Sequence, residues 1–215
     1  MKLNKESNTY IIIYSTILVL IVAFLLAFVS QTLKPMQDNN EALDTRKQIL
    51  YSLNLRDTVA TLADEQINAL YEATITQTDS VADEKGKQKP FVYYATVNGE
   101  QKYVLPLKGQ GMWGGISAFL AIDSDKNTIY GAYFNHESET AGLGAEIKDN
   151  AQWQQKFRGK KIFADSTEIA LSVEKNVNNA TTVDAVTGAT VTSTAVSTML
   201  QDQLRSKYMD FLSRH

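Results

Sequence analysis

The chain has 215 residues, a length that suits one folded domain with a short appendage, and a net charge of −3. Of its residues, 44% are hydrophobic and 21% are charged, a composition that excludes wholesale disorder. Because there is no basic surplus, we expect no nucleic-acid partner. The chain has no cysteine and only two histidines, so disulfides, cysteine-ligated centres and multi-histidine metal sites are excluded, and any redox chemistry must come from an organic cofactor.

The N-terminal part contains a long apolar run. Residues 10–29 read YIIIYSTILVLIVAFLLAFV, without charge or proline. Twenty helical residues rise about 30 Å, the thickness of a bilayer's hydrocarbon core. A cleaved signal peptide is the alternative, but its apolar region is shorter and ends in a small-residue cleavage site, which this run lacks. We therefore predict an uncleaved transmembrane helix over residues 10–30, preceded by a cytoplasmic N-terminus of residues 1–9.

The charges that flank this run predict its orientation. Lys2 and Lys5 precede it, whereas Lys34 follows it among acidic residues. Since basic residues favour the cytoplasmic side, the N-terminus is expected in the cytoplasm. The sequence thus predicts a single-pass protein of the inner membrane whose main domain lies in the periplasm of a double-membraned bacterium.

Residues 31–90 are predicted to form a helical connecting region. Apolar residues recur at helical spacing over 41–53 and again over 64–71. Residues 77–90, QTDSVADEKGKQKP, are polar and end in proline. We predict that this last stretch is an exposed loop.

Residues 91–215 are predicted to form one domain of mixed structure. Alternating apolar residues predict two β-hairpins, over 91–107 around Asn98-Gly99 and over 116–134. A short helix near Trp153, a strand near Ile162 and another strand over 169–173 are expected to follow. Apolar residues four apart then predict one amphipathic helix over about 190–211. The predicted fold class is α+β, a transmembrane helix followed by a single domain with antiparallel β-hairpins and a C-terminal helix.

Glycines are concentrated in the middle of the chain. Seven of the eleven lie between Gly109 and Gly144. Such a cluster allows close backbone approach and can line a flat ligand. For Gly109 and Gly131 we favour ordinary turn chemistry at the ends of hairpins.

Residues 184–190 carry the motif with the most specific chemistry. They read Asp-Ala-Val-Thr-Gly-Ala-Thr and match D-x-x-[S/T]-G-A-[S/T], the acceptor signature for covalent flavinylation. Thr190 lies where the C-terminal helix is expected to begin, a position that suits an N-cap threonine. The start of a helix favours a phosphate because its N–H groups are unpaired and its dipole is positive there. A threonine-rich helix cap without a ligand is the alternative interpretation.

The chain resembles the C subunit of the bacterial Na+-translocating NADH:quinone reductases. The likeness rests on the N-terminal span, the segment 112–147 beginning Met-Trp-Gly-Gly, and the late DAVTGAT. The resemblance implies an FMN-binding domain in which a flavin transferase moves FMN from FAD onto Thr190 as a phosphoester. It also implies a subunit without turnover of its own in a six-subunit membrane complex, which oxidises NADH, reduces quinone and exports Na+.

Two other functions stay open at this point. The related G subunit of the Rnf ferredoxin:NAD+ complex shares the flavin-binding domain, although the Met112–Gly115 opening and the length are closer to the quinone reductase family. A membrane-anchored FMN-binding or sensor module without redox turnover is the second alternative, and it gives no reason for DAVTGAT.

The resemblance also implies which residues contact the flavin. The stretch 136–144 resembles the family's H-x-E-T-P-G-L-G loop but has Ala141 where proline is usual, and its histidine-to-glutamate spacing is one residue longer. No catalytic residue and no metal ligand are expected. The predicted cofactor-binding residues are Trp113, Gly114, Glu139, Thr140, Gly142, Leu143, Gly144, Asp184, Thr187, Gly188, Ala189, Thr190 and Thr192.

Some of these residues have structural alternatives. Glu139 and Thr140 would also suit the cap of a helix that starts near Gly144. Trp113 would also suit a hydrophobic core, and His136 a solvated loop. Asp184 has three possible roles: it is recognised by the transferase, it positions a metal during transfer, or it accepts hydrogen bonds from the backbone of its own loop.

Overall fold

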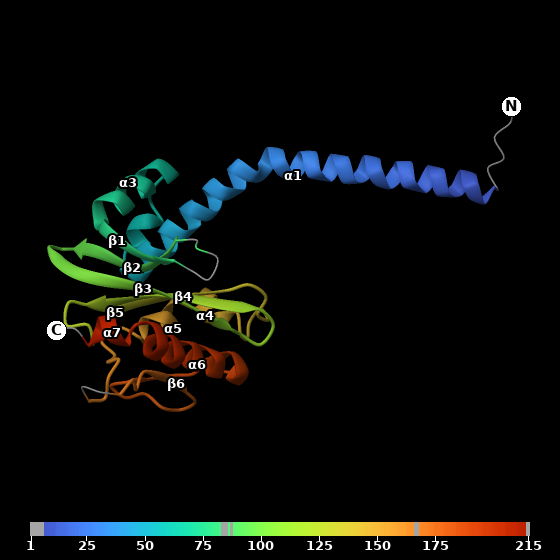
Figure 1. The fold of residues 1–215 in the computed structure, drawn as a ribbon. Coiled ribbons are helices and arrows are strands. Elements are labelled where there is room, and N and C mark those ends of the chain that lie inside the picture. The colour runs from blue at the N-terminus through green and yellow to red at the C-terminus, as the bar shows by residue number, and fades with distance from the viewer. Residues whose placement is uncertain (1–6, 83–85, 87, 166–167, 214–215) are drawn as a thin grey trace. The chain divides into compact units, whose positions relative to one another are not determined.

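A computed structural model describes residues 7–82, 86, 88–165 and 168–213 (Figure 1). The chain divides into two units, residues 1–44 and 45–215, and each is described by itself. The lysines used to predict the orientation, Lys2 and Lys5, lie outside the described residues, as does His215.

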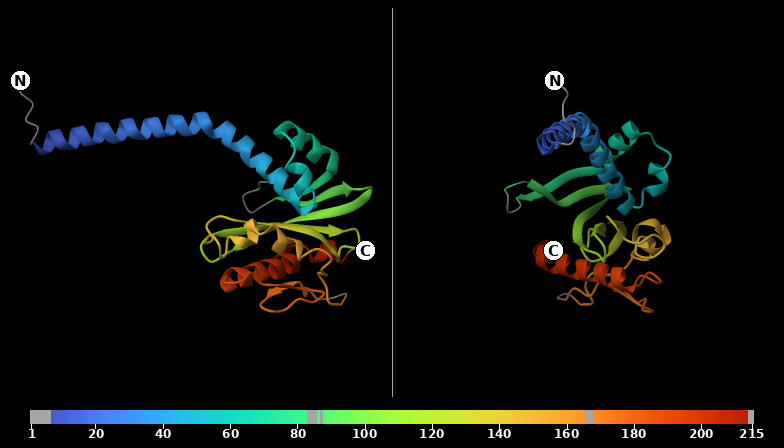
Figure 2. Two further views of the ribbon diagram at one scale, coloured as in Figure 1. Left: turned by 180° about the vertical axis from the view of Figure 1, so that it is seen from behind. Right: turned by 90° about the vertical axis from the view of Figure 1, so that its right-hand side faces the viewer.

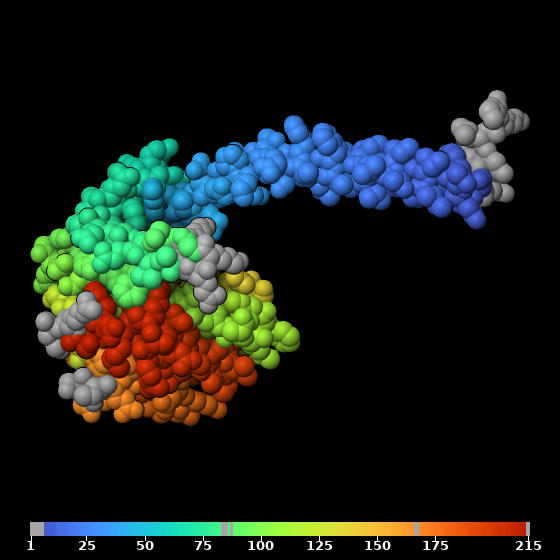
Figure 3. All heavy atoms as spheres, viewed as in Figure 1, coloured from blue at the N-terminus to red at the C-terminus, as the bar shows by residue number. Residues whose placement is uncertain are grey.

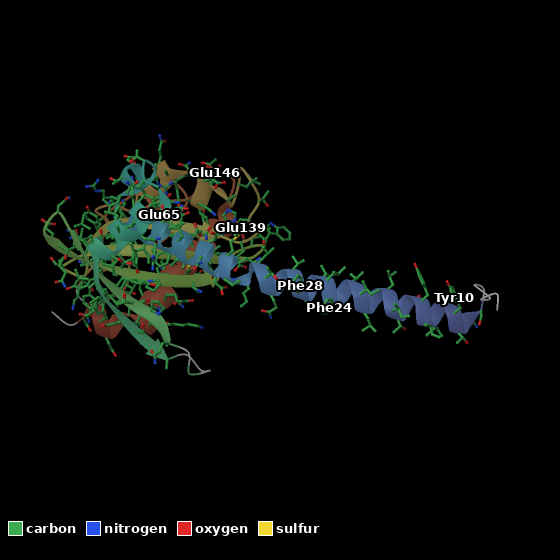
Figure 4. All side chains as sticks on the ribbon, turned by 90° about the horizontal axis from the view of Figure 1, so that it is seen from above. Tyr10, Phe24, Phe28, Glu65, Glu139 and Glu146 are labelled. Atoms are coloured by element: carbon green, nitrogen blue, oxygen red, sulfur yellow. The ribbon has the colours of Figure 1, made fainter. Side chains whose placement is uncertain are left out.

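The long helix α1 spans Asn8–Ser52. Its residues 8–44 belong to the first unit, and its last eight residues belong to the second. Between Ile11 and Val29 its large apolar side chains are exposed, and Figure 4 shows them projecting along the helix between the labelled Tyr10 and Phe28. A helix that is apolar all round suits a bilayer. Within the described part of the chain, α1 alone is long and apolar enough to cross a membrane. The predicted span over 10–30 lies inside it, and the helix continues through Pro35.

The second unit is built on an antiparallel five-stranded sheet in the order β1-β2-β3-β4-β5. Both predicted hairpins are confirmed. Asn98 and Gly99 have φ angles of 53° and 80°, the positive values that a tight turn between twisted strands requires. The strands are β1 (Ile75–Ala82), β2 (Gln88–Val97), β3 (Glu100–Gln110), β4 (Gly115–Asp123) and β5 (Ile129–His136).

The prediction of an exposed loop over residues 77–90 was wrong. Most of this stretch belongs to β1 and the start of β2, which pair from Ile75 opposite Ala95 to Ala82 opposite Gln88. Six of the eight β1 residues are exposed, because β1 lies at the edge of the sheet. An edge strand that buries so little has no apolar alternation to reveal it. Two short helices, α2 (Arg56–Val59) and α3 (Asp64–Thr74), precede β1.

Helices cover both faces of the sheet (Figures 1 and 2). On one face, Ile49 in the last turns of α1 and Leu53 just after it pack with Tyr93, Val104 and Ala121. The other face carries the larger core, formed with α4 (Glu146–Asp149), α5 (Ala151–Gln155) and the C-terminal helix α6 (Thr190–Lys207). The outer side of α6, red in Figure 3, faces solvent. The predicted α+β class is confirmed.

The C-terminal third is partly as predicted. The helix begins at Thr190 as expected but is interrupted at Tyr208, after which α7 spans Met209–Leu212. The expected strand near Ile162 is reduced to isolated bridges, and the next strand, β6, spans Ser172–Glu174. Its parallel partner β7 (Thr182–Asp184) was missed, because three residues are too few to show a period. β7 leads the chain to the start of α6.

Gly109 and Gly131 do not lie in turns, and our interpretation of both was wrong. They lie inside β3 and β5, where another segment comes too close for a side chain. A Cβ on Gly109 would lie 2.7 Å from the Cβ of Met199 in α6. A Cβ on Gly131 would meet the carbonyl oxygen of Ser52. The two glycines therefore let the helical layers approach the sheet.

Gly109→Ala is expected to destabilise the second unit by about 1–3 kcal/mol, because the new methyl group overpacks the contact between β3 and α6. Chemical unfolding of the full-length chain in detergent, followed by tryptophan fluorescence, measures this cost. Lys108→Ala changes the exposed neighbour on the same strand and is expected to cost less than about 0.5 kcal/mol. Equal costs for the two variants would contradict the packing argument.

Candidate functional site

Thr190 is the first residue of α6, and its side chain is exposed. The cap residue is Ala189, one position earlier than predicted, and no side chain of the described residues caps this helix. Gly188, just before it, has a φ of 79°, the left-handed conformation that glycine adopts without strain. Among the described residues, none forms a hydrogen bond with the Thr190 hydroxyl. This hydroxyl is therefore accessible at the start of a long helix.

Four exposed apolar side chains gather around Thr190. Met112, Trp113, Leu143 and Val191 are 51%, 63%, 44% and 55% exposed, and we call them the apolar rim. In the described part of the second unit, Val81 is the one other large hydrophobic residue with comparable exposure. Exposed apolar residues that cluster in this way are typical of a binding surface.

The rim and Thr190 enclose one shallow hollow of about 420 Å³. Its lining comes from the turn between β3 and β4, the loop after β5 and the start of α6. Nine of the thirteen residues predicted to contact the flavin line it. These nine are Trp113, Glu139, Thr140, Leu143, Gly144, Gly188, Ala189, Thr190 and Thr192.

The four remaining predicted residues lie beside this hollow. Gly114 follows Trp113, and its carbonyl accepts a hydrogen bond of 2.8 Å from the N–H of Gly111. Gly142, Asp184 and Thr187 line a neighbouring hollow with Trp153. The structure therefore brings most of the predicted residues together but divides the DAVTGAT motif between this hollow and its neighbours.

Glu139 connects the three segments that form the hollow. Glu139 is buried, with only 7% of its surface exposed. Oε1 accepts a hydrogen bond of 2.9 Å from the N–H of Trp113, and Oε2 accepts one of 2.6 Å from the hydroxyl of Thr192 in α6. The loop that carries Glu139 is thus held to the β3–β4 turn and to the first turn of α6 (Figure 4 labels Glu139).

Burial would by itself raise the pKa of Glu139. The hydrogen bonds from Thr192 and from the N–H groups of Trp113 and Met112 together outweigh burial and hold that pKa below its usual value. The carboxylate is therefore ionised at neutral pH, which is the form that accepts all of these bonds.

Two glycines make room for this carboxylate. A Cβ on Gly111 would lie 2.5 Å from Oε1 of Glu139, and one on Gly144 would lie 2.5 Å from Oε2 and 2.6 Å from the Thr192 hydroxyl. Gly142 has a φ of 72° and turns the same loop. The glycine cluster therefore permits close approach around Glu139, in addition to shaping the hollow.

The structure also decides between the alternative roles. No side chain caps α4, and Glu139 points to Trp113 and Thr192 instead, so the capping alternative was wrong. Trp113 is too exposed to be a core residue. His136 is the last residue of β5 and is half-buried, and its Nδ1 accepts a hydrogen bond of 3.2 Å from the N–H of Glu139, which ties the loop to the end of the strand.

Asp184 supports the backbone around the motif. Its Oδ1 accepts a hydrogen bond of 2.8 Å from the N–H of Asn176, and its carbonyl accepts one of 2.9 Å from the indole of Trp153. Lys156 lies 4.0 Å from its other carboxylate oxygen. Of the three roles considered for Asp184, these contacts favour the one in its own loop.

Sequence reasoning missed two residues of the site, Met112 and Val191. Met112 adjoins Trp113 and was noted only as part of a motif. Val191 stands alone among threonines, and an isolated valine in a helix carries no signal of exposure. Only the fold shows that both side chains reach the hollow.

Lowering the pH is expected to loosen the site. Since the pKa of Glu139 is depressed in the folded state, its stabilising contribution is complete above the ordinary carboxyl pKa of about 4.3 and is lost as the pH falls through the folded value. In a Trp153→Phe background, the fluorescence of Trp113 should change in this acidic range. Glu139→Gln should remove that change, and its persistence there would contradict the assignment to Glu139.

The residues present fit FMN. The apolar rim offers surface for a flat ring, and the hydroxyl of Thr190 offers an acceptor for a phosphoester. The first turn of α6, a helix of 18 residues, leaves N–H groups without helical partners, which suit a phosphate. Small residues at positions 188 and 189 keep the approach to the hydroxyl open.

Comparisons with known proteins agree with this site. Residues 111–205 match the family model described as FMN-binding domain. The chain is 31% identical to the C subunit of the Na(+)-translocating NADH-quinone reductase of Haemophilus ducreyi, over 91% of this chain and 89% of that protein. It is 27% identical to the protein of the same name from Pseudomonas aeruginosa, over 92% and 91% of the two chains.

A solved structure shows the same fold. The crystal structure of the C subunit of the Na(+)-translocating NADH-quinone reductase from Parabacteroides distasonis superposes with a TM-score of 0.73 at 35% identity, covering 85% of this chain and 98% of that one. Together with the identity over nearly the whole chain to the Haemophilus ducreyi protein, this means that the chain belongs to the family of C subunits of the Na(+)-translocating NADH-quinone reductase.

Proposed function

We propose that this chain is an electron-transfer subunit that carries FMN covalently on Thr190 through a phosphoester. The observation that carries the proposal is an exposed hydroxyl, free of hydrogen bonds to the described residues, at the start of α6 and inside the apolar rim. The acceptor motif supplies this hydroxyl, and the FMN-binding domain match covers it. A flavin transferase is the partner that attaches the group during maturation.

The protein's part in this function is to position and to tether. FMN, when bound, supplies reversible electron transfer, while the chain supplies orientation and electrostatics. The rim residues exclude water from one side of the hollow, and the N–H groups at the start of α6 stabilise negative charge beside Thr190. Glu139 keeps the loop bearing Leu143 and the turn bearing Trp113 at fixed positions relative to Thr190.

The subunit is proposed to act inside a six-subunit membrane complex and not by itself. Within that complex it would relay electrons from NADH toward quinone, coupled to the export of Na+. The relatives reported above are named as subunits of a Na(+)-translocating NADH-quinone reductase, which supports this complex over the Rnf complex.

The apolar helix α1 is proposed to anchor the chain as a single-pass protein of the inner membrane. It is long enough to cross the hydrocarbon core, and its apolar side chains are exposed on all sides. With the N-terminus in the cytoplasm, the FMN-binding domain would lie in the periplasm. A tether then has a clear use, since FMN lost to that compartment is not readily replaced.

The mass of the intact chain tests the proposal. Protein isolated from its native membrane should be heavier than the sequence by about 438 Da, the mass that FMN adds as a phosphoester. Flavin fluorescence should also stay with the chain after denaturation. Native protein of unmodified mass would overturn the covalent assignment and would favour a binding or sensor module.

A further inference from the structure

A second hollow lies apart from the candidate flavin site. Its volume is about 380 Å³, and it shares no lining residue with the hollow around Thr190. It is formed where α2 and α5 meet β5, and its lining is mostly polar. The lining residues that matter here are Asn54, Arg56, Asp57, Gln155 and Arg158.

Arg56 is held in place from three sides. Its guanidinium carbon lies 4.8 Å from the ring centre of Tyr51 and 5.5 Å from that of Tyr133. One N–H donates a hydrogen bond of 2.9 Å to Oε1 of Gln154, which is buried and donates in turn to the carbonyls of Ile147 and Lys148. The planar group is therefore oriented before any ligand arrives, which lowers the entropy cost of binding.

The charge of this hollow is not balanced by the protein. Arg56 and Arg158 both line it, whereas Asp57 is the one acidic residue in its lining within the described part of the chain. Among the residues that the structure describes, neither arginine forms an ion pair. The guanidinium of Arg56 is half-buried against two tyrosine rings and an amide oxygen, and none of these neutral groups compensates its charge.

We propose that this hollow is an oxyanion site that takes a carboxylate or phosphate group. The fork of a guanidinium matches two oxygens of either group, and a second arginine increases the attraction. Asn54 and Gln155 also line the hollow, and the Asn54 amide donates a hydrogen bond of 2.7 Å to the carbonyl of Tyr130. The volume exceeds that of a bare oxyanion, so the group would arrive on a small organic molecule or on an acidic side chain of a neighbouring subunit.

Thermal unfolding of the full-length chain in detergent, with inorganic phosphate or citrate as the probe, tests the proposal. At constant ionic strength, either probe should raise the unfolding temperature, by an amount that grows with the logarithm of its concentration once the site is saturated. Arg158→Gln should weaken binding about tenfold or more, the loss expected for a hydrogen bond to a charged group. Arg205→Gln, an exposed change in α6 outside the hollow, should leave binding unchanged.

Arg158 is exposed, so its replacement is not expected to impair folding. Absence of a rise in the unfolding temperature with both probes, or equal weakening by Arg158→Gln and Arg205→Gln, would overturn the proposal. Repeating the titration on the assembled complex identifies the source of the group. A response that persists there indicates a free anion, whereas a response confined to the isolated chain indicates an acidic group of a neighbouring subunit. Failure of flavin attachment would affect neither result, because the hollow shares no residue with the flavin site.

Discussion

Thr190→Ala is expected to abolish covalent flavin while leaving the fold intact. The hydroxyl is the proposed acceptor, and a methyl group offers no oxygen to esterify. Because the side chain is exposed and its hydroxyl bonds to none of the described residues, its loss leaves no buried polar group unsatisfied. The free energy of unfolding should therefore change by less than about 0.5 kcal/mol. Co-expression with a flavin transferase, followed by a denaturing gel and intact mass, measures the loss.

Two further variants make this test specific. Thr190→Ser keeps a hydroxyl at the same position and should retain covalent flavin. Thr198→Ala removes an exposed threonine two turns further along α6 and should also retain it. Flavin that stays covalently bound to Thr190→Ala would move the acceptor to another hydroxyl of the motif, with Thr187 and Thr192 as the next candidates.

Helices and strands with a regular hydrophobic period could be predicted from the sequence. The Asn98-Gly99 turn and the alternation on either side of it predicted the first hairpin, because a half-buried strand and a tight turn both leave local signals. The four-residue spacing from Val196 to Leu204 predicted α6, because one side of that helix is buried. The edge strand β1 left no such signal, since it buries almost nothing.

The sequence predicted which residues form the site, but not the hydrogen bonds that connect them. A motif and a family resemblance indicated most of the residues that line the hollow. The bonds from Glu139 join residues 26 and 53 positions apart in the chain, and no local pattern in a single sequence records such pairs. Exposure of Met112 and Val191 was equally hidden, because an apolar residue in a sequence is by default expected in the core.

Glu139→Ala is expected to destabilise the second unit by about 2–4 kcal/mol, the largest effect on stability among the variants considered. The change removes the hydrogen bonds that the charged carboxylate accepts from Trp113, Met112 and Thr192, and it leaves the buried hydroxyl of Thr192 without its partner. Glu139→Gln should cost only about 1 kcal/mol, because an amide keeps one oxygen acceptor and the Thr192 hydroxyl can accept from its N–H group. Chemical unfolding of chains without flavin measures both costs independently of loading.

The neighbouring Glu137 provides the matched control. It lies on the same loop and accepts one hydrogen bond of 3.1 Å, from the N–H of Gly115, but it is exposed. Glu137→Ala should therefore cost less than about 1 kcal/mol and leave the rate of flavin attachment unchanged. Glu139→Ala should also slow the attachment of flavin, because the carboxylate that holds the loop and the β3–β4 turn together beside Thr190 is lost. If the two alanine variants were equally stable, the carboxylate of Glu139 could not be what holds the hollow together.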